Sequence, residues 1–344
     1  MTTRTLSFHA NYRCHHSGAC CTSNWPIPVE ADRLGRIRAA MASGALRPPH
    51  AGAGETFIEV AGAPLDAPVL LATADERCVF YDAGARRCSV QRAMGHDALP
   101  LACRQFPRVS LRDPRGVSVT LSHYCPTAAA LLDADGVATI VSDPAAFPSD
   151  GEYIGLDATT SLPPLLRPDM LMDWDSWWEW ERLSVELLAS CNNAALGLAR
   201  LAAAVENARS WSPAEGTLLS RVRSAFDHAQ AVTIVPGRWT DGDIVVRRQE
   251  IAAAIPAELQ PTTDGVKRST VSDGVVTRLL ASHAFANWTA HLGRGLRTWL
   301  RSVEAPLALI QSGLDVRTVD LWLRHLVDPK RAAESWSEAE LQGN

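Results

Sequence analysis

The chain has 344 residues, of which 47% are hydrophobic and 21% are charged, a balance typical of globular rather than disordered proteins. A formal net charge of -5 argues against a general nucleic-acid-binding protein, because phosphate binding needs clustered positive charge. Charged and amide side chains interrupt the most apolar stretch, 185–204, and the first residues lack an apolar signal core. We therefore expect a soluble cytoplasmic protein that does not interact with membranes.

The N-terminal part of the chain combines a helix with short strands. The stretch 29–43 has a helical period of apolar residues, and Gly44 follows it as a helix-ending residue. The sequence "TFIEV" at 56–60 predicts a short strand. Two alternating apolar runs within 108–122 flank the turn residues 113–116, and this pattern predicts a β-hairpin.

The composition changes near residue 145. Segment 146–170 is rich in Pro, Asp and Gly, which is typical of a linker or a segment that wraps around a domain. Helical patterns then dominate: 173–211 predicts one long helix or two, and Ser212 is placed to cap the next. The predicted fold class is α+β, with a cysteine-rich metal-binding N-terminal module at 1–145, a linker at 146–170 and a mainly α-helical domain at 171–344.

Seven of the eight cysteines precede residue 126. In a reducing cytoplasm such a cluster more often binds metal or performs redox chemistry than forms disulfides. The eighth, Cys191, lies in an apolar helical pattern that predicts a buried, inert thiol. The candidate metal ligands are Cys14, Cys20, Cys21, Cys78, Cys88, Cys103 and Cys125.

The cysteine spacing matches neither a zinc ribbon nor the tight run of a bacterial ferredoxin. Neighbouring side chains diverge, so the Cys20–Cys21 pair favours an iron–sulfur cluster or paired metals over a single zinc ion. Seven thiols also exceed the four that fill a tetrahedral zinc site or a cuboidal iron–sulfur site. The sequence "CVFYDAGARRC" at 78–88 predicts a hairpin with a thiol at each base.

These motifs resemble the YkgJ-type cysteine-cluster family of zinc- or iron-chelating proteins, and most closely its flagellin lysine-N-methylase (FliB-like) branch. The resemblance covers about residues 12–130. It is carried by Cys20-Cys21, Trp25, Cys78, Phe80, Cys88, Val90-Gln91, Gly95, Leu99, Cys103-Arg104, Phe106-Pro107-Arg108 and Cys125-Pro126.

The resemblance implies a chelated iron–sulfur cluster or zinc ion. For the FliB-like branch it also implies transfer of a methyl group from S-adenosylmethionine to a lysine on a partner protein. Two positions depart from the family pattern. Ser17 stands where a further cysteine is usual, so that His15 or His16 is an alternative ligand, and Thr127 replaces a glutamate. The sequence itself contains no motif typical of a methyl-donor site. Such a motif would be a Gly-rich loop directly after a strand, with an acidic residue further along the chain.

Three functions therefore stay open: a lysine methyltransferase, a non-catalytic protein whose metal holds the fold, and a redox protein. The sequence indicates no catalytic residue and no oligomeric state. His123 and Tyr124 either orient a ligand beside Cys125 or pack at the strand end. The Trp-rich run at 173–180 serves either partner recognition or packing between domains.

Overall fold

The computed structural model describes residues 1–23, 25, 27–49, 55–59, 67, 69–74, 77–233, 240–256 and 271–341. Contacts divide the chain into two compact units. The first, here called the cysteine unit, comprises residues 13–108 and 125–127. The second, the helical unit, comprises residues 1–12, 109–124 and 128–344. Short strands and helices occur together, which confirms the predicted α+β class.

This division differs from the expected segments 1–145, 146–170 and 171–344. The difference arises because the first strand of the chain and the predicted hairpin at 108–122 belong to one sheet of the helical unit. The cysteine unit is thus an insertion within the sequence of the helical unit. Composition could not reveal this, since strand partners far apart in sequence leave no local signal.

The cysteine unit is built from short elements around a small core. Its three-stranded sheet has the order β2-β4-β3, and two further ladders pair β5 with β6 and β7 with β8. Phe80 and Ile37 are fully buried at its centre. The bounds are β2 Pro28–Val29, α1 Ala31–Ala42, β3 Phe57–Glu59, β4 Val69–Leu71, β5 Thr73–Ala74, β6 Arg77–Cys78, β7 Tyr81–Asp82, β8 Arg87–Cys88, α2 Ser89–Met94 and α3 Leu101–Gln105.

The helix predicted at 29–43 is α1, whose face carrying Leu34 and Ile37 is buried. The strand predicted at 56–60 is β3, with Val60 outside the described residues. The hairpin predicted at 78–88 is only partly right. Its turn joins β7 to β8, so that Cys88 pairs with Tyr81, whereas Cys78 pairs with Thr73 in the preceding ladder.

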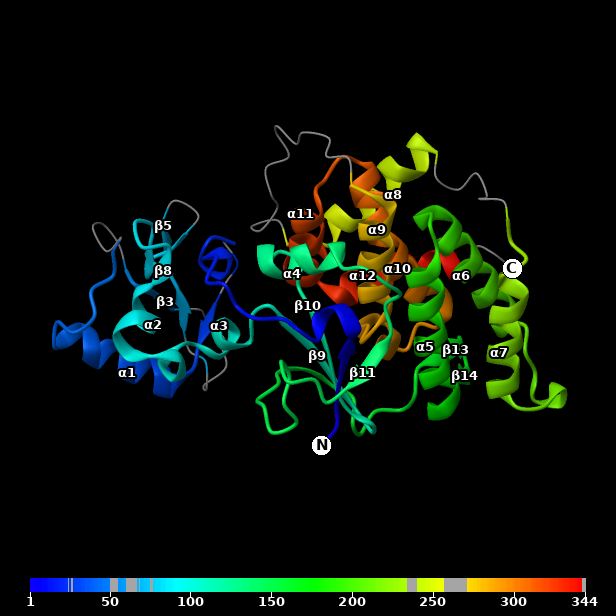
Figure 1. Cartoon of the computed structure of the whole chain (residues 1–344), viewed down its shortest axis with the longest axis horizontal. Coiled ribbons are helices and arrows are strands. Elements are labelled where there is room, and N and C mark those ends of the chain that lie inside the picture. The colour runs from blue at the N-terminus through cyan, green and yellow to red at the C-terminus, as the bar shows by residue number, and fades with distance from the viewer. Residues whose placement is uncertain are drawn as a thin grey trace. The chain divides into compact units, whose positions relative to one another are not determined.

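The helical unit contains a five-stranded sheet of order β11-β1-β10-β9-β12 (Figure 1). Strand β1 runs parallel to β10 and antiparallel to β11, and β12 runs parallel to β9. Strand β12 lies within segment 146–170, which the sequence predicts to be a linker. The bounds are β1 Thr3–Leu6, β9 Arg108–Asp113, β10 Gly116–Leu121, β11 Ile140–Ser142, β12 Gly155–Asp157, β13 Leu165–Arg167 and β14 Met170–Leu171.

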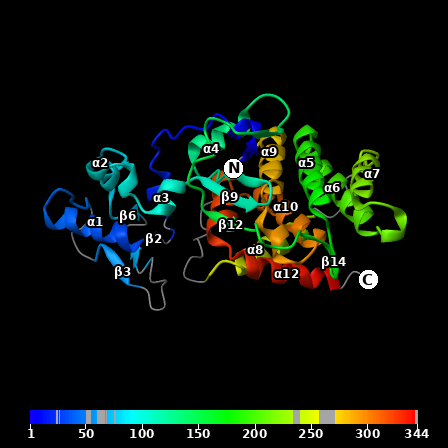
Figure 2. The same ribbon diagram turned by 90° about the horizontal axis from the view of Figure 1, so that it is seen from below.

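The helices of this unit pack around a large apolar core. Helices α5 and α9 lie side by side, as do α6 and α7 (Figures 1 and 2). Trp177, Trp180 and Trp299 are fully buried between them. The bounds are α4 Pro126–Ala130, α5 Trp174–Ser190, α6 Ala194–Arg209, α7 Leu218–Ala229, α8 Asp241–Ala253, α9 Asp273–Ala284, α10 Leu296–Gln311, α11 Val316–Leu321 and α12 Pro329–Leu341.

The long helical pattern at 173–211 forms two helices, with buried Cys191 directly after the first. Ser212 precedes a short 3-10 turn rather than α7, because Gly216 interrupts the pattern and Thr217 caps that helix instead. Within the described part of the chain, no helix combines the length and apolarity that a membrane crossing requires.

Candidate metal centre

The adjacent cysteines lie in one 3-10 turn, Ala19–Cys21, in which Cys21 N donates to Gly18 O. The Sγ atoms of Cys20 and Cys21 are 3.9 Å apart. Two sulfurs bound to one tetrahedral ion, with bonds of about 2.3 Å, lie about 3.8 Å apart. The turn therefore suits a shared ion as well as two ions, so the sequence argument for paired metals is not a geometric requirement.

Gly18 allows this turn to pack against β7. Its φ of +78° lies in the left-handed region, and a Cβ at this position would stand 2.8 Å from Cε2 of Tyr81. Any other residue would combine backbone strain with a steric overlap. Gly18 thus determines how closely the turn that bears Cys20 and Cys21 approaches the core of the cysteine unit.

Three further thiols are placed by other elements. Cys78 is the last residue of β6, Cys88 is the last residue of β8, and Cys103 lies in α3. The Glu30 carboxylate accepts hydrogen bonds from Leu101 N at 3.1 and 3.2 Å, which fixes the start of the short helix that bears Cys103. Elements far apart in the sequence therefore each contribute a sulfur.

The five thiols of Cys20, Cys21, Cys78, Cys88 and Cys103 form a group whose members affect one another's ionisation. Cys21 hydrogen-bonds with both Cys20 and Cys88. The bond from Cys21 lowers the pKa of Cys20, and it lowers the pKa of Cys88 to about 7. The same two bonds raise the pKa of Cys21, which keeps its proton. The pKa values of Cys20 and Cys88 are thus lowered beside Cys21, whose pKa is raised.

The remaining two thiols resist ionisation. Burial raises the pKa of Cys78 to about 12. Burial also raises the pKa of Cys103 well above its usual range, and charge on Cys20, Cys78 or Cys88 raises it further. Without a cation, the group cannot carry many thiolates at neutral pH. The donor set therefore fits a thiophilic metal, whose positive charge would compensate the thiolates.

The other two predicted ligands are Cys14 and Cys125. Cys14 is exposed, with its Sγ 4.0 Å from Nδ1 of His16, and His15 is exposed beside it. Cys125 is buried in the cysteine unit. Taking the described residues as they stand, no three His, Cys, Asp or Glu side chains are arranged to hold a metal ion. Binding would therefore require the thiols to draw together.

Other residues of the cysteine motifs build the frame of this unit. Trp25 packs on Phe106 with ring centroids 5.1 Å apart, which brings the segment after the cysteine pair against the segment after Cys103. Phe80 packs on Phe57 at 6.3 Å. Contacts between apolar side chains thus join the segments that flank the thiols.

The helical unit holds a buried polar network that no sequence motif announced. His123 donates its backbone N–H to Asp320, its Nδ1 lies 3.0 Å from Oδ2 of Asp320, and its Nε2 lies 3.1 Å from Nε2 of His9. Asp320 also contacts His283 at 2.7 Å and Arg324 at 3.3 Å. His123 is thus part of this network, while the ring of Tyr124 lies under the guanidinium of Arg317.

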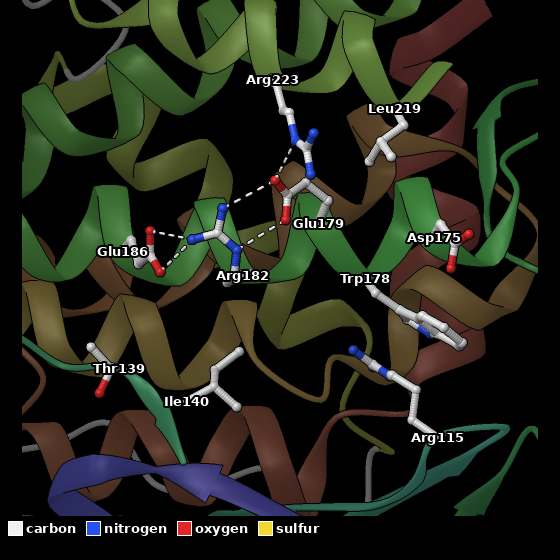
Figure 3. Close-up of a pocket in the computed structure, with 10 residues that line it drawn as sticks. All are labelled: Arg115, Thr139, Ile140, Asp175, Trp178, Glu179, Arg182, Glu186, Leu219 and Arg223. Atoms are coloured by element: carbon white, nitrogen blue, oxygen red, sulfur yellow. Dashed lines mark hydrogen bonds and ion pairs between the residues drawn. The ribbon is translucent and has the colours of Figure 1, made fainter. Parts of the chain in front are cut away.

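The Trp-rich run is mainly a core element, because Trp177 and Trp180 are fully buried within the helical unit. Trp178 lines an open pocket of about 510 Å³ on the outer side of α5 (Figure 3). There Arg182 bonds with Glu179 and Glu186, and Arg223 bonds with Glu179 (Figure 3). Arg182 and Arg223 are thus paired with acidic side chains, and the exposed carboxylate of Asp175 also lines the pocket.

The cysteine unit is therefore a compact α+β module whose interior gathers thiols, as expected of a metal-chelating domain. Residues 13–126 match the family model described as "CxxCxxCC: Putative zinc- or iron-chelating domain". The matched residues correspond closely to the cysteine unit, and the match supports metal binding in general. No curated protein and no solved structure matches the chain.

Proposed function

We propose that the cysteine unit chelates an iron–sulfur cluster, with zinc as the alternative metal. The observation that carries this proposal is the group formed by Cys20, Cys21, Cys78, Cys88 and Cys103, in which other thiols of the group contribute to the pKa of each member. Five thiols are enough to supply the four cysteines of either a tetrahedral zinc site or an iron–sulfur cluster. Iron–sulfur clusters are held by cysteine thiolates, which is the donor type gathered here.

The five thiols would hold the metal, with Cys125 as a further buried thiol of the same unit. Cys14 and His16 form an exposed pair of donors, and either would take the place of the cysteine missing at Ser17. When bound, the metal would supply positive charge that keeps the thiolates ionised. Bound thiolates would also link β6, β8, α3 and the 3-10 turn into one frame.

Anaerobic purification followed by metal analysis and an absorption spectrum tests this proposal. We expect stoichiometric iron and the visible absorption of an iron–sulfur cluster. A colourless protein with stoichiometric zinc would overturn the assignment of an iron–sulfur cluster. Cys103→Ser should abolish metal retention and destabilise the cysteine unit, whereas Cys191→Ser, a matched change of a buried thiol in the helical unit, should not. Equal metal content in both variants would refute the ligand assignment.

A finer proposal concerns activity. The motif resemblance to flagellin lysine-N-methylases supports a cytoplasmic S-adenosylmethionine-dependent methyltransferase that acts on lysine of a partner protein. This proposal rests on the resemblance alone. Calorimetry of S-adenosylmethionine with the metal-loaded chain, and mass spectrometry of flagellin after incubation with both, test it directly. Absence of donor binding would leave a structural or redox role for the metal, and a reversible spectral change with dithionite would favour the redox role.

A further inference from the structure

The buried network in the helical unit is centred on Asp320, the next-to-last residue of α11. Burial alone would raise the pKa of this carboxyl group, but Arg324 and the bonds from His123 and His283 hold it well below its usual range. An ionised carboxylate can only accept hydrogen bonds. His283 therefore directs its Nε2–H at Asp320, which assigns Nδ1 as its unprotonated nitrogen.

His283 and Arg324 stand side by side, because His283 Nε2 and Arg324 Nε both contact the same oxygen, Oδ1 of Asp320. Both side chains line a cavity of about 200 Å³ within the helical unit. Its other walls are largely apolar and come from β9, α10, α12 and the segment between α9 and α10. They include Trp288, Leu323, Val327, Ala332 and Trp336.

Two polar side chains of the cavity wall, Asn287 and Ser302, bond with each other and with neighbouring groups. Asn287 Nδ2 donates to His283 O and to Ser302 Oγ, while its Oδ1 accepts from Thr289 N. Ser302 Oγ in turn donates to Trp299 O. Arg324 has five N–H donors, and its bonds to Asp320 and Ser282 O use two of them. Arg324, Nδ1 of His283 and the buried Nε1–H of Trp336, for which the described residues offer no acceptor, are thus available to a ligand.

The backbone around this cavity is irregular at two points. Ala286, in its wall, has a φ of +52°, which a residue with a Cβ rarely adopts. Arg324 and Leu323 lie in a π-helical turn, Trp322–Leu326, that follows α11. Strained residues and π-helical turns occur preferentially at functional sites. Both irregularities here hold residues of the same cavity wall.

We propose that this cavity binds a small 2-hydroxycarboxylate with an apolar body. The planar fork of Arg324 matches a carboxylate, and Nδ1 of His283 accepts a hydrogen bond from the neighbouring hydroxyl group. The tryptophan and aliphatic walls cover the apolar part. A cavity of about 200 Å³ corresponds to the volume of about seven water molecules, which limits the ligand to a small molecule. The site is independent of the proposed metal centre.

Calorimetry with three probes of similar size tests this inference on the metal-loaded full chain. Mandelate carries both groups, phenylacetate lacks the hydroxyl, and 1-phenylethane-1,2-diol lacks the carboxylate. We expect mandelate to bind about tenfold more tightly than phenylacetate, as one net hydrogen bond implies, and the diol to bind most weakly. Equal affinities, binding of the diol alone or no binding of mandelate would overturn the proposal.

Two variants place the probe in this cavity. Ala332→Met fills the space without altering the network and should abolish binding, whereas Ser335→Met, an exposed change on the same helix, should not. Arg324→Lys keeps a cation beside Asp320 but loses the planar guanidinium fork. It should therefore weaken the binding of mandelate and phenylacetate and leave the affinity for the diol unchanged. Unchanged mandelate affinity in Ala332→Met would locate the binding elsewhere and refute the assignment.

Discussion

Replacing Gly18 by alanine is expected to displace the turn that carries Cys20 and Cys21. Two costs add in the metal-free protein. Alanine at a φ of +78° costs about 1–2 kcal/mol, because an L-residue is strained in the left-handed region. The new Cβ would also stand 2.8 Å from Cε2 of Tyr81, and overpacking of this kind typically costs about 1–3 kcal/mol.

Gly44 provides a matched control. Its φ of +76° is nearly the same, but a Cβ there would meet nothing within 4 Å. Gly44→Ala should therefore show the backbone cost alone, about 1–2 kcal/mol, without loss of metal. The difference between the two variants isolates the contact with Tyr81.

Hydrogen exchange of peptides from 13–108 under reducing, metal-free conditions measures the local opening free energy in both variants. Metal retention after anaerobic purification is the second readout. Gly18→Ala should lower the opening free energy about 1–3 kcal/mol more than Gly44→Ala and should reduce metal content. The reasoning is refuted if the two variants open equally, or if Tyr81→Leu in the Gly18→Ala background restores nothing.

Two further predictions follow from the titrating groups. Burial lowers the pKa of His9 well below its usual range, that of His283 to about 4 and that of His325 to about 3. Unfolding at pH 4.5–6 therefore takes up about three protons, and the helical unit should lose up to about 4 kcal/mol of stability per pH unit as the pH falls through this window. Urea unfolding followed by tryptophan emission measures this slope, and a flat profile would contradict it. In the metal-free protein, the rate at which Cys88 reacts with iodoacetamide should rise with a midpoint near pH 7, while Cys78, with a pKa of about 12, stays unreactive. Mass spectrometry of the alkylated peptides measures which cysteine reacts first. Metal loading should protect Cys88 from alkylation.

Elements specified by local patterns were predictable from the sequence. The apolar period of α1 and the alternation around the turn between β9 and β10 depend on residues close in the chain, and both predictions are confirmed. The hairpin at 78–88 was predicted in the wrong register for Cys78. Its strands have two residues each, so alternation carries too little information to fix which residues pair.

The candidate site was predictable in its donor type but not in its arrangement. Clustering of thiols in the sequence indicated a metal site, while the hydrogen bonds that make Cys88 acidic and Cys21 resistant to ionisation depend on tertiary contacts. The network around Asp320 left no sequence signal at all. Asp320 and His123 are 197 residues apart, and buried histidines in apolar surroundings resemble ordinary core residues.

The insertion of the cysteine unit between β1 and the rest of the helical unit has a consequence for biosynthesis. All residues of the cysteine unit have been synthesised by residue 127, before any residue of α5 has been made. Strand β1, in contrast, is synthesised before the cysteine unit but can pair only after its partners β10 and β11 have been made. The chain therefore offers its thiols to a metal donor while the larger unit is still an incomplete nascent polypeptide, so metal loading can precede folding of most of the protein.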